Sequence, residues 1–239
     1  MKVTIKDCTE HPLDQIAEAA GTSTDRRDAS FKRVRRCFEQ GHGAVFEFAD
    51  VTLFIEGISR ACSHQLVRHR IASYCQKSQR YTTLEGADWY VTPPEISKSA
   101  ELRARFDDMM LLSKSAYDAT LNRGIKPEDA RFLLPEATKT AITMKINARS
   151  LFNFMNLRTA QSAQWEIRDL ANSIIEAVKG INEQWKQLIE LWDDKGVTRR
   201  EIVDDALAWF GVDESDPELV RDVTAYIESI YDRIKRGGR

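Results

Sequence analysis

The stretch SHQLVRHRIASYCQKSQRY, residues 63–81, gathers four cationic residues and two histidines with no carboxylate among them. Arg68, Arg70 and Arg80 stand there together with Ser78. Guanidinium groups bind phosphate and carboxylate through paired hydrogen bonds, and their charge is not lost near neutral pH. The stretch therefore predicts an anion-binding site, and a solvated basic surface is the alternative. The intervening residues Ile71, Ala72, Tyr74 and Tyr81 are not those of a solvated charge run.

The spacing of Arg68 and Arg70 leaves their relative orientation open. On a helix the two side chains would diverge by about 200° and would serve different ligand groups or different subunits. On a strand they would share one face. Ser78 has no base beside it in the sequence, so a nucleophilic role has no support from its neighbours.

A second candidate is NARSLFNFMNLRTAQSAQWEIR, residues 147–168, where polar and apolar residues alternate at near-helical spacing. Asn147, Asn153 and Asn156 lie within ten positions, beside Arg149 and Arg158. Asparagine inside a helix competes for backbone hydrogen bonds, so this cluster carries a local cost that usually signals ligand contact. The alternative is a helix whose amides satisfy a neighbouring loop.

Several familiar kinds of site have no support. The histidines, His11, His42, His64 and His69, show no metal-ligand spacing, and neither a catalytic triad nor a glycine-rich phosphate loop is evident. Cys8, Cys37, Cys62 and Cys75 lack a CxxC pair, which argues against a zinc site and a disulfide framework. We therefore expect reduced thiols in a cytoplasmic protein.

The composition predicts a globular protein with a sizeable core, because 42% of its 239 residues are apolar. With 35 basic against 37 acidic residues, the chain lacks the overall positive charge of a general nucleic-acid binder. The local exception is the segment 58–84, whose charged residues are Arg60, Arg68, Arg70, Lys77 and Arg80. Neither a secretory signal nor an apolar run long enough to span a membrane is present.

The pattern of apolar residues predicts the elements in the first half of the chain. Residues 2–6 alternate as a strand does, and residues 28–40 have helical spacing that stops at Gly41. Residues 46–57 are expected to form a long strand ending at Gly57, followed by a helix from Ser59 to about Arg68.

The second half is expected to be mostly helical. After Pro93 and Pro94, residues 101–124 carry a helical stripe that ends on Gly124, and a short helix begins around Pro127. Residues 138–192 are expected to be helical almost throughout, with 193–239 as an appended helical segment. The predicted class is α+β, a central antiparallel sheet flanked by helices, in one domain over residues 1–192 with a C-terminal extension.

The string RHRIASYCQKS, residues 68–78, fits Arg-His-Arg, seven residues, then Ser, and resembles the signature of the flavin-dependent thymidylate synthases. GHGAVFEF upstream is similar to that family's Gly-His segment before a Phe-Glu pair. QRY continues the motif, and ARFLLP and the 147–168 block match two later family blocks in order. The resemblance covers roughly residues 35–192.

This resemblance implies a homotetramer of mixed α/β fold that binds FAD and dUMP at sites shared between subunits. The implied reaction moves a one-carbon unit from methylenetetrahydrofolate to C5 of dUMP, giving dTMP. Reduced FAD supplies the hydride, and NADPH restores the flavin. Both FAD and dUMP carry phosphate, which accounts for a basic cluster on a near-neutral chain. Neither a nucleic acid nor a membrane is implied as a partner.

The resemblance also implies roles for individual residues. The implied FAD-binding residues are His42, Arg68, His69, Arg70, Gln76, Asn147, Ala148, Arg149 and Asn153. The implied dUMP-binding residues are Gln65, Leu66, Val67, Arg68, Gln76, Lys77, Ser78, Gln79, Arg80, Arg131 and Arg158. Arg158 matches the arginine credited with ionising the uracil at N3. Because a guanidinium is a poor base, its physical role should be to stabilise the anionic uracil.

Four positions depart from the family pattern. Ala44 and Phe48 stand where a hydroxyl residue and a histidine are frequent, Lys77 where an apolar residue is usual, and Ser162 where a histidine is common. Two other functions therefore stay open. One is a nucleotide-binding or regulatory protein without turnover, and the other is a single-stranded nucleic-acid binder that stacks bases on Tyr74 and Tyr81.

Overall fold

The computed structural model describes residues 1–22, 30–84, 86–193, 219–223 and 225–226. It falls into two units, Met1–Lys186 and Gln187–Arg239. The elements that carry the predicted site lie in the first unit. In the second unit, residues 219–223 are helical. The rest of the predicted extension beyond residue 193 lies outside the described residues, apart from 225–226.

A four-stranded antiparallel sheet forms the centre of the first unit, as predicted. Its strands, in the spatial order β1-β2-β4-β3, are β1 (Lys2–Cys8), β2 (Asp50–Ser59), β4 (Lys139–Asn147) and β3 (Ser73–Gln76). The pairing of β2 with β4 is the longest and runs from Asp50 opposite Asn147 to Ser59 opposite Lys139. The two strands therefore form the spine of the sheet.

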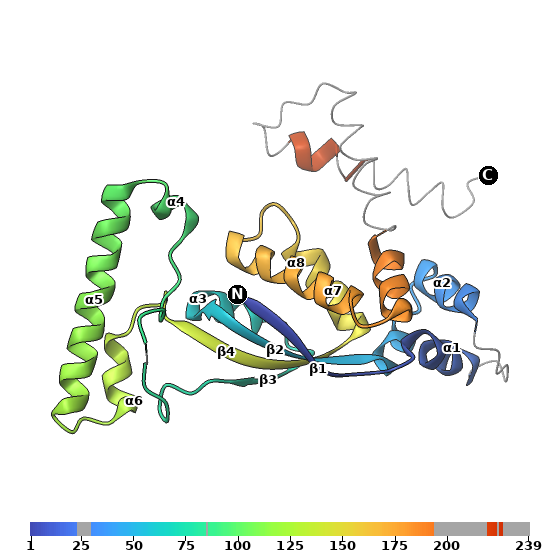
Figure 1. Ribbon diagram of the computed structural model, residues 1–239. Helices are drawn as coiled ribbons and strands as arrows, with labels where there is room; N and C mark the ends of the chain where they lie inside the picture. The colour runs from blue at the N-terminus through green and yellow to red at the C-terminus, as the bar shows by residue number, and fades with distance from the viewer. Residues whose placement is uncertain (23–29, 85, 194–218, 224, 227–239) are drawn as a thin grey trace. The chain divides into compact units, whose positions relative to one another are not determined.

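Three helices pack on one face of this sheet: α3 (Arg60–Leu66), α7 (Ala148–Arg158) and α8 (Trp165–Lys179) (Figure 1). Alternate residues of the central strands are buried under them, namely Val51, Leu53, Ile55, Ile142, Met144 and Ile146. The helices contribute buried apolar residues that include Leu66, Leu151, Phe154, Ile167, Leu170 and Ile174. Burial of these side chains fixes how α3 and α7 sit on the strands.

The remaining helices flank the sheet. One group lies between β1 and β2 in the chain and comprises α1 (Pro12–Thr22), α2 (Phe31–Glu39) and the 3-10 helix η1 (Gly43–Phe48). The other group comprises α4 (Pro94–Ser97), α5 (Ala100–Asn122), α6 (Pro127–Ala130) and the 3-10 helix η2 (Arg131–Leu133). Gly41 and Gly124 have φ of 75° and 79°, so the predicted glycine stops after α2 and α5 are confirmed.

The prediction that residues 138–192 are helical almost throughout was wrong at its start. Residues 139–147 form β4, in the middle of the sheet. Its burial alternates strictly from Thr140 to Ile146, a period of two that the longer helical pattern after it obscured. The predicted helical C-terminal half therefore contributes a central strand.

The predicted strand at 46–57 also needs correction at both ends. Residues 46–48 belong to η1, where Phe46 packs edge-on against Phe38 and Phe152, so aromatic packing overrides the β pattern. The strand then runs past Gly57 to Ser59. Gly57 has a φ of 76° and interrupts the register between Glu56 and Ile58, which makes it a bulge rather than an end.

Two strand-to-helix turns bring the sequence motifs together. The hydroxyl of Ser59 accepts from the backbone N–H of Cys62 and caps α3, and Oδ1 of Asn147 accepts from the N–H of Ser150 and caps α7. Because β2 and β4 are antiparallel, α7 starts at the opposite end of the sheet from α3 and runs back toward it. Its last residue, Arg158, thereby reaches the turn that follows α3.

Candidate active site

Arg158, at the C-terminal end of α7, is held by the segment that follows α3. Its Nε donates to Nε2 of His69 at 2.9 Å, and its Nη2 donates to the backbone carbonyl of Gln65 at 3.4 Å. Both contacts come from the predicted anion-binding stretch, 89 and 93 residues away in sequence. The structure therefore joins the two motifs that the sequence singled out.

His69 is built to accept this hydrogen bond. Its side chain is buried, and its ring meets the edge of Phe154 at 4.9 Å between centroids. Burial, with the nearby positive charge of Arg158, lowers the pKa of His69 to about 4. The imidazole is therefore neutral near neutral pH, and the nitrogen facing Arg158 is an acceptor.

Tyr74 fixes the backbone of the turn between α3 and β3. Its hydroxyl lies 3.0 Å from the carbonyl oxygens of both Leu66 and His69 and donates to this pair. Burial raises the pKa of Tyr74 to about 12. The turn leaves Arg68 and Arg70 exposed on either side of buried His69. These arginines thus belong neither to a helix nor to a strand, and both geometries that the sequence allowed for them were wrong.

The last residue of β3 and the segment that follows it, residues 76–80, are tied to their neighbours through side chains. Gln76 Nε2 donates to the hydroxyl of Ser63 at 2.7 Å and lies 3.3 Å from that of Thr140. The hydroxyl of Ser78 accepts from the backbone N–H of Arg80 at 3.2 Å. Among the described residues this hydroxyl is bonded to backbone and not to a histidine or carboxylate, which agrees with a ligand role.

Glu128 of α6 connects two of the predicted dUMP-binding arginines. Arg80 Nε and Nη2 both lie 2.9 Å from Oε2 of Glu128, and Arg131 Nε donates to the Glu128 carbonyl at 3.0 Å. Tyr81 is largely exposed, with the guanidinium of Arg80 5.4 Å from its ring centre. Residues 76–80 and Arg131, far apart in sequence, therefore share one cluster.

A separate cluster surrounds Arg149 in the first turn of α7. Its Nη1 donates to Oε1 of Glu47 at 2.5 Å, and its side chain crosses over Gly43. A Cβ added to Gly43 would lie 2.9 Å from Nε of Arg149, so only glycine permits this approach. His42, just before η1, is exposed next to this position. Predicted FAD contacts of η1 and α7 are thus adjacent.

Three further residues predicted to bind FAD, all at or in α7, lie in different local surroundings. Asn147 caps α7 through Oδ1, and Ala148 is buried, its N–H donating to the carbonyl of Ala49. Asn153 is exposed on α7. Their contact with a flavin stays a prediction. The alternative interpretation, amides that satisfy a neighbouring loop, does not describe Asn147, whose Oδ1 bonds the first turn of its own helix.

Sequence reasoning missed residues that support the site rather than form its motifs. Arg60 was counted in the basic cluster but given no role, and its Nη2 donates to the carbonyl of Lys77. Glu47 belongs to the Phe-Glu pair of the GHGAVFEF segment but was given no role, and it accepts a hydrogen bond from Arg149. Buried Glu166 accepts from the backbone N–H of Ser59 at 2.7 Å and from its hydroxyl at 2.5 Å. Glu166 could have been identified from the sequence, because it is a carboxylate on an otherwise apolar face of the helix that contains it.

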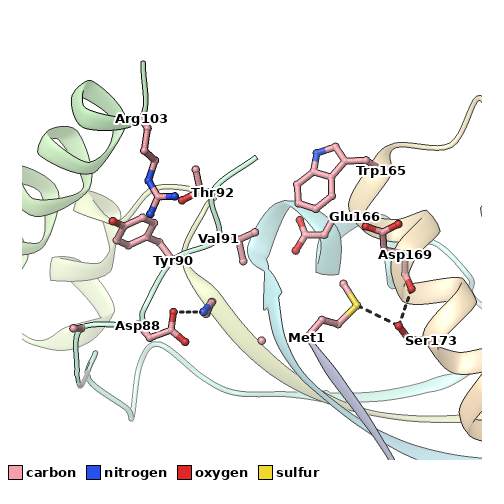
Figure 2. Close-up of a pocket in the computed structure, with 13 residues that line it drawn as sticks. Met1, Asp88, Tyr90, Val91, Thr92, Arg103, Trp165, Glu166, Asp169 and Ser173 are labelled. Atoms are coloured by element: carbon pink, nitrogen blue, oxygen red, sulfur yellow. Dashed lines mark hydrogen bonds and ion pairs between the residues drawn. The ribbon is translucent and has the colours of Figure 1, made fainter. Parts of the chain in front are cut away.

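A cavity of about 660 Å³ has none of the predicted site residues among those that line it (Figure 2). It is lined by the first turns of α8, the 87–92 segment and Arg103 of α5. Three of the charged groups that line it are engaged with protein partners: Arg103 with Asp107, Lys139 with Asp88, and Glu166 with Ser59.

Other kinds of site find no support in the described part of the chain. Within it, no cluster of histidine, cysteine or acidic residues has the arrangement of a metal site. All four cysteines are free thiols, as expected, and burial raises the pKa of the Cys62 thiol above its ordinary value. Across the same residues, none of the helices has the length and apolar character needed to cross a membrane.

Comparison with known proteins agrees with these motifs. The family model described as thymidylate synthase complementing protein matches residues 4–182. The flavin-dependent thymidylate synthase of Pyrococcus furiosus is 41% identical over 190 residues, covering 74% of this chain and 78% of the relative. That of Geobacter sulfurreducens is 49% identical over 142 residues, or 59% of this chain and 61% of the relative.

A solved structure extends the similarity to the fold. The crystal structure of the flavin-dependent thymidylate synthase ThyX from Helicobacter pylori, complexed with FAD and dUMP, is 27% identical and superimposes with a TM-score of 0.66. The match covers 81% of this chain and 99% of that one. The chain therefore belongs to the thymidylate synthase complementing protein family, the family of the flavin-dependent thymidylate synthases.

Proposed function

We propose that this protein is a flavin-dependent thymidylate synthase that converts dUMP to dTMP. In this reaction methylenetetrahydrofolate donates the carbon, FAD carries the hydride and NADPH is the reductant. The observation that carries the proposal is the contact between Arg158 and His69, which unites the two family motifs in one site. Relatives that match most of the chain bear the same activity in their names.

The residues present fit a bound flavin dinucleotide. Arg68 and Arg70 are exposed beside buried His69, and Arg149 is fixed by Glu47 next to Gly43. Guanidinium groups match the diphosphate, and glycine allows a close approach of the backbone. When bound, FAD supplies the hydride transfer that protein side chains cannot perform. The proposed flavin residues remain His42, Arg68, His69, Arg70, Gln76, Asn147, Ala148, Arg149 and Asn153.

Arg158 is the proposed catalytic residue. A guanidinium keeps its proton near neutral pH, so Arg158 acts as a fixed positive charge and not as a base. Its bonds to His69 and to the Gln65 carbonyl orient the group before substrate arrives. A preorganised charge favours the anionic uracil formed as C5 becomes nucleophilic, without reorganisation at that moment.

The nucleotide is proposed to lie along the turn after α3 and the segment after β3. The residues for this are Gln65, Leu66, Val67, Arg68, Gln76, Lys77, Ser78, Gln79, Arg80 and Arg131. Ser78 is a ligand in this arrangement, because its hydroxyl is bonded to the Arg80 N–H and lacks an activating base. Arg80 and Arg131, both in contact with Glu128, supply positive charge for the phosphate.

The proposed assembly is a homotetramer with active sites shared between subunits. Large apolar side chains are exposed along α5 and η2, namely Leu102, Met109, Leu111, Leu112, Phe132 and Leu133. At helical spacing Leu102, Met109 and Leu112 share one face of α5, and exposed apolar residues grouped in this way favour a protein contact. Arg68, Arg70 and Asn153 are also exposed, which leaves room for a second subunit to complete the site. Sedimentation of the FAD-loaded protein at several concentrations tests the number of subunits.

The proposed domain extends over residues 1–192, with 193–239 as an extension. The family match to residues 4–182 and the compact unit Met1–Lys186 both support a boundary near this position. A cytoplasmic location is proposed from the free thiols. Truncation after residue 192 should leave flavin binding intact, and loss of FAD from the truncated protein would contradict the boundary.

The departures from the family pattern lie at exposed positions. Ala44, Phe48, Lys77 and Ser162 all have accessible side chains, and Phe48 is 58% exposed. None of them replaces an arginine of the proposed site. We infer that they modify flavin contacts without removing the activity.

The decisive experiment is release of tritium from dUMP tritiated at C5, with methylenetetrahydrofolate, NADPH and FAD-loaded protein. We expect the wild-type protein to be yellow and to release tritium, and Arg158→Ala to lose at least about 100-fold in rate while still binding FAD. Wild-type protein that binds dUMP but neither releases tritium nor rescues a thymidine auxotroph would instead be a nucleotide-binding regulator. Arg158→Ala at the wild-type rate would overturn the catalytic assignment.

A further inference from the structure

Tyr74, in β3, reaches back to the turn after α3 and closes a small loop of the chain. Its hydroxyl lies 3.0 Å from the carbonyl oxygens of both Leu66 and His69, eight and five residues earlier. The side chain is half-buried, and its polar end is therefore engaged within the chain. This arrangement gives Tyr74 a use other than the base stacking that the sequence had left open.

Two consecutive carbonyls at the end of α3, those of Gln65 and Leu66, each accept from the turn itself and from a distant side chain. The Gln65 carbonyl accepts from the backbone N–H of Arg68 at 3.3 Å and from Nη2 of Arg158 at 3.4 Å. The Leu66 carbonyl accepts from the backbone N–H of His69 at 3.2 Å, in addition to the tyrosine hydroxyl. The end of α3 is thereby joined to α7 through one residue and to β3 through the next.

Tyr74 is itself held by the centre of the sheet. It pairs with Met144 of β4, and the Met144 side chain is fully buried. Arg68 and Arg70 of the turn lie in neither a helix nor a strand, and both are exposed. Backbone groups outside regular structure need partners from side chains. The Tyr74 hydroxyl supplies such a partner and links the turn to a buried strand.

We propose that Tyr74 is a positioning residue for the reaction, whose hydroxyl holds the turn so that Arg68 and Arg70 face FAD while His69 stays in contact with Arg158. The inference rests on the proposed function, because Tyr74 acts through these residues and not on the ligands. One turn then serves both ligands, since the two flavin arginines flank the histidine that orients the nucleotide arginine.

The test is Tyr74→Phe, which removes the hydroxyl and keeps the ring. At saturating dUMP we expect tritium release per bound flavin to fall about 10-fold, and FAD to bind about 3- to 10-fold more weakly. The ¹³C signal of His69 should titrate above pH 4, because a loosened turn reduces both its burial and its contact with Arg158. The matched control is Tyr90→Phe, which also loses a hydroxyl hydrogen bond, to Asp107 of α5 at 2.7 Å, and should match wild type in all three measurements.

Hydrogen exchange separates positioning from general stability. The amides of Arg68 and His69, which donate to the last carbonyls of α3, should be protected in FAD-loaded wild-type protein. In Tyr74→Phe these two amides should exchange faster, while those of β2 and β4 keep their wild-type rates. Unprotected Arg68 and His69 amides in the wild type would overturn the proposal, whether or not the variant folds.

The other outcomes are equally decisive. Wild-type rate, FAD affinity and His69 titration in Tyr74→Phe would overturn the positioning role. Faster exchange throughout the sheet in this variant would do the same, because it would mark a residue needed for stability alone. Wild-type protein that binds no FAD or releases no tritium contradicts the proposed function instead, and with it the part of Tyr74 in this reaction.

Discussion

Nε of Arg158 donates a hydrogen bond to Nε2 of His69 across 2.9 Å, and this contact joins α7 to the turn after α3. The sequence had placed the two residues in different roles, one on the nucleotide and the other on the flavin. Their contact gives His69 a second role as the group that orients the Arg158 guanidinium.

Replacement of His69 should separate orientation of Arg158 from binding of FAD. In His69→Leu no acceptor remains for Arg158 Nε, so we expect tritium release from dUMP to fall about 100-fold. In His69→Gln the amide oxygen can accept in place of the ring nitrogen, so a much larger share of the rate should remain. Equal rates in the two variants at equal flavin content would contradict the orienting role. His11→Gln, at an exposed position, is the control.

The protonation of His69 should occur well below neutral pH. Because burial and Arg158 both disfavour its cation, the pKa of native His69 is about 4 against an ordinary value of 6.5. Between these values the unfolded chain binds a proton that the native protein does not. The stability contribution of neutral His69 is therefore present above pH 6.5 and is lost as pH falls to about 4.

Labelling the four histidines with ¹³C at Cε1 allows this titration to be followed by NMR. One signal, absent from His69→Gln, should titrate near pH 4 and not near 6.5. The midpoint of urea unfolding should fall more steeply between these pH values in wild type than in His69→Gln. A His69 signal that titrates at 6.5 would be incompatible with its role as the acceptor.

Glu166 should contribute to stability through Ser59. Its carboxylate, 2% exposed, accepts from both the N–H and the hydroxyl of Ser59, the residue that caps α3. Glu166→Gln places an N–H₂ group against one of these donors, so we expect a loss of about 1–3 kcal/mol in the free energy of unfolding. Urea unfolding measures this loss, and exposed Glu176→Gln on the same helix is the matched control. Equal unfolding midpoints for the two variants would contradict the coupling of α8 to α3.

Gly43 should affect FAD binding through the position of the Arg149 side chain, and not through its own backbone conformation. An alanine Cβ would lie 2.9 Å from Nε of Arg149, near the flexible end of that side chain. Gly43→Ala should therefore displace Arg149 with little effect on the melting temperature and weaken FAD binding about 3- to 10-fold. Flavin fluorescence measures the affinity. The control is Gly180→Ala, whose Cβ would lie at ordinary contact distance from its nearest neighbours. Unchanged FAD affinity in Gly43→Ala would argue against a flavin contact by Arg149.

Local patterns in the chain allowed part of the fold to be predicted. Glycine stops after α2 and α5 and the proline start of α6 depend on single residues, and all three were confirmed. The strand β4 was not predicted, because its alternation of buried and accessible residues is short and merges with the helical pattern that follows. Residues 46–48 were misassigned because packing of Phe46 on Phe38 and Phe152 decides their conformation. The contact with Phe152 joins residues more than a hundred positions apart, so no local pattern reveals it.

From residue types alone the chain could be predicted to have an anion-binding cluster, and the order of its motifs identified the family. Those properties depend on residue types and short spacings, which a linear string retains. Only the tertiary structure decided which side chains meet: Arg158 with His69, Arg149 with Glu47, and Arg60 with the Lys77 carbonyl. These contacts are set by the antiparallel register of β2 and β4, because that register fixes where α3 and α7 begin and how far each one reaches.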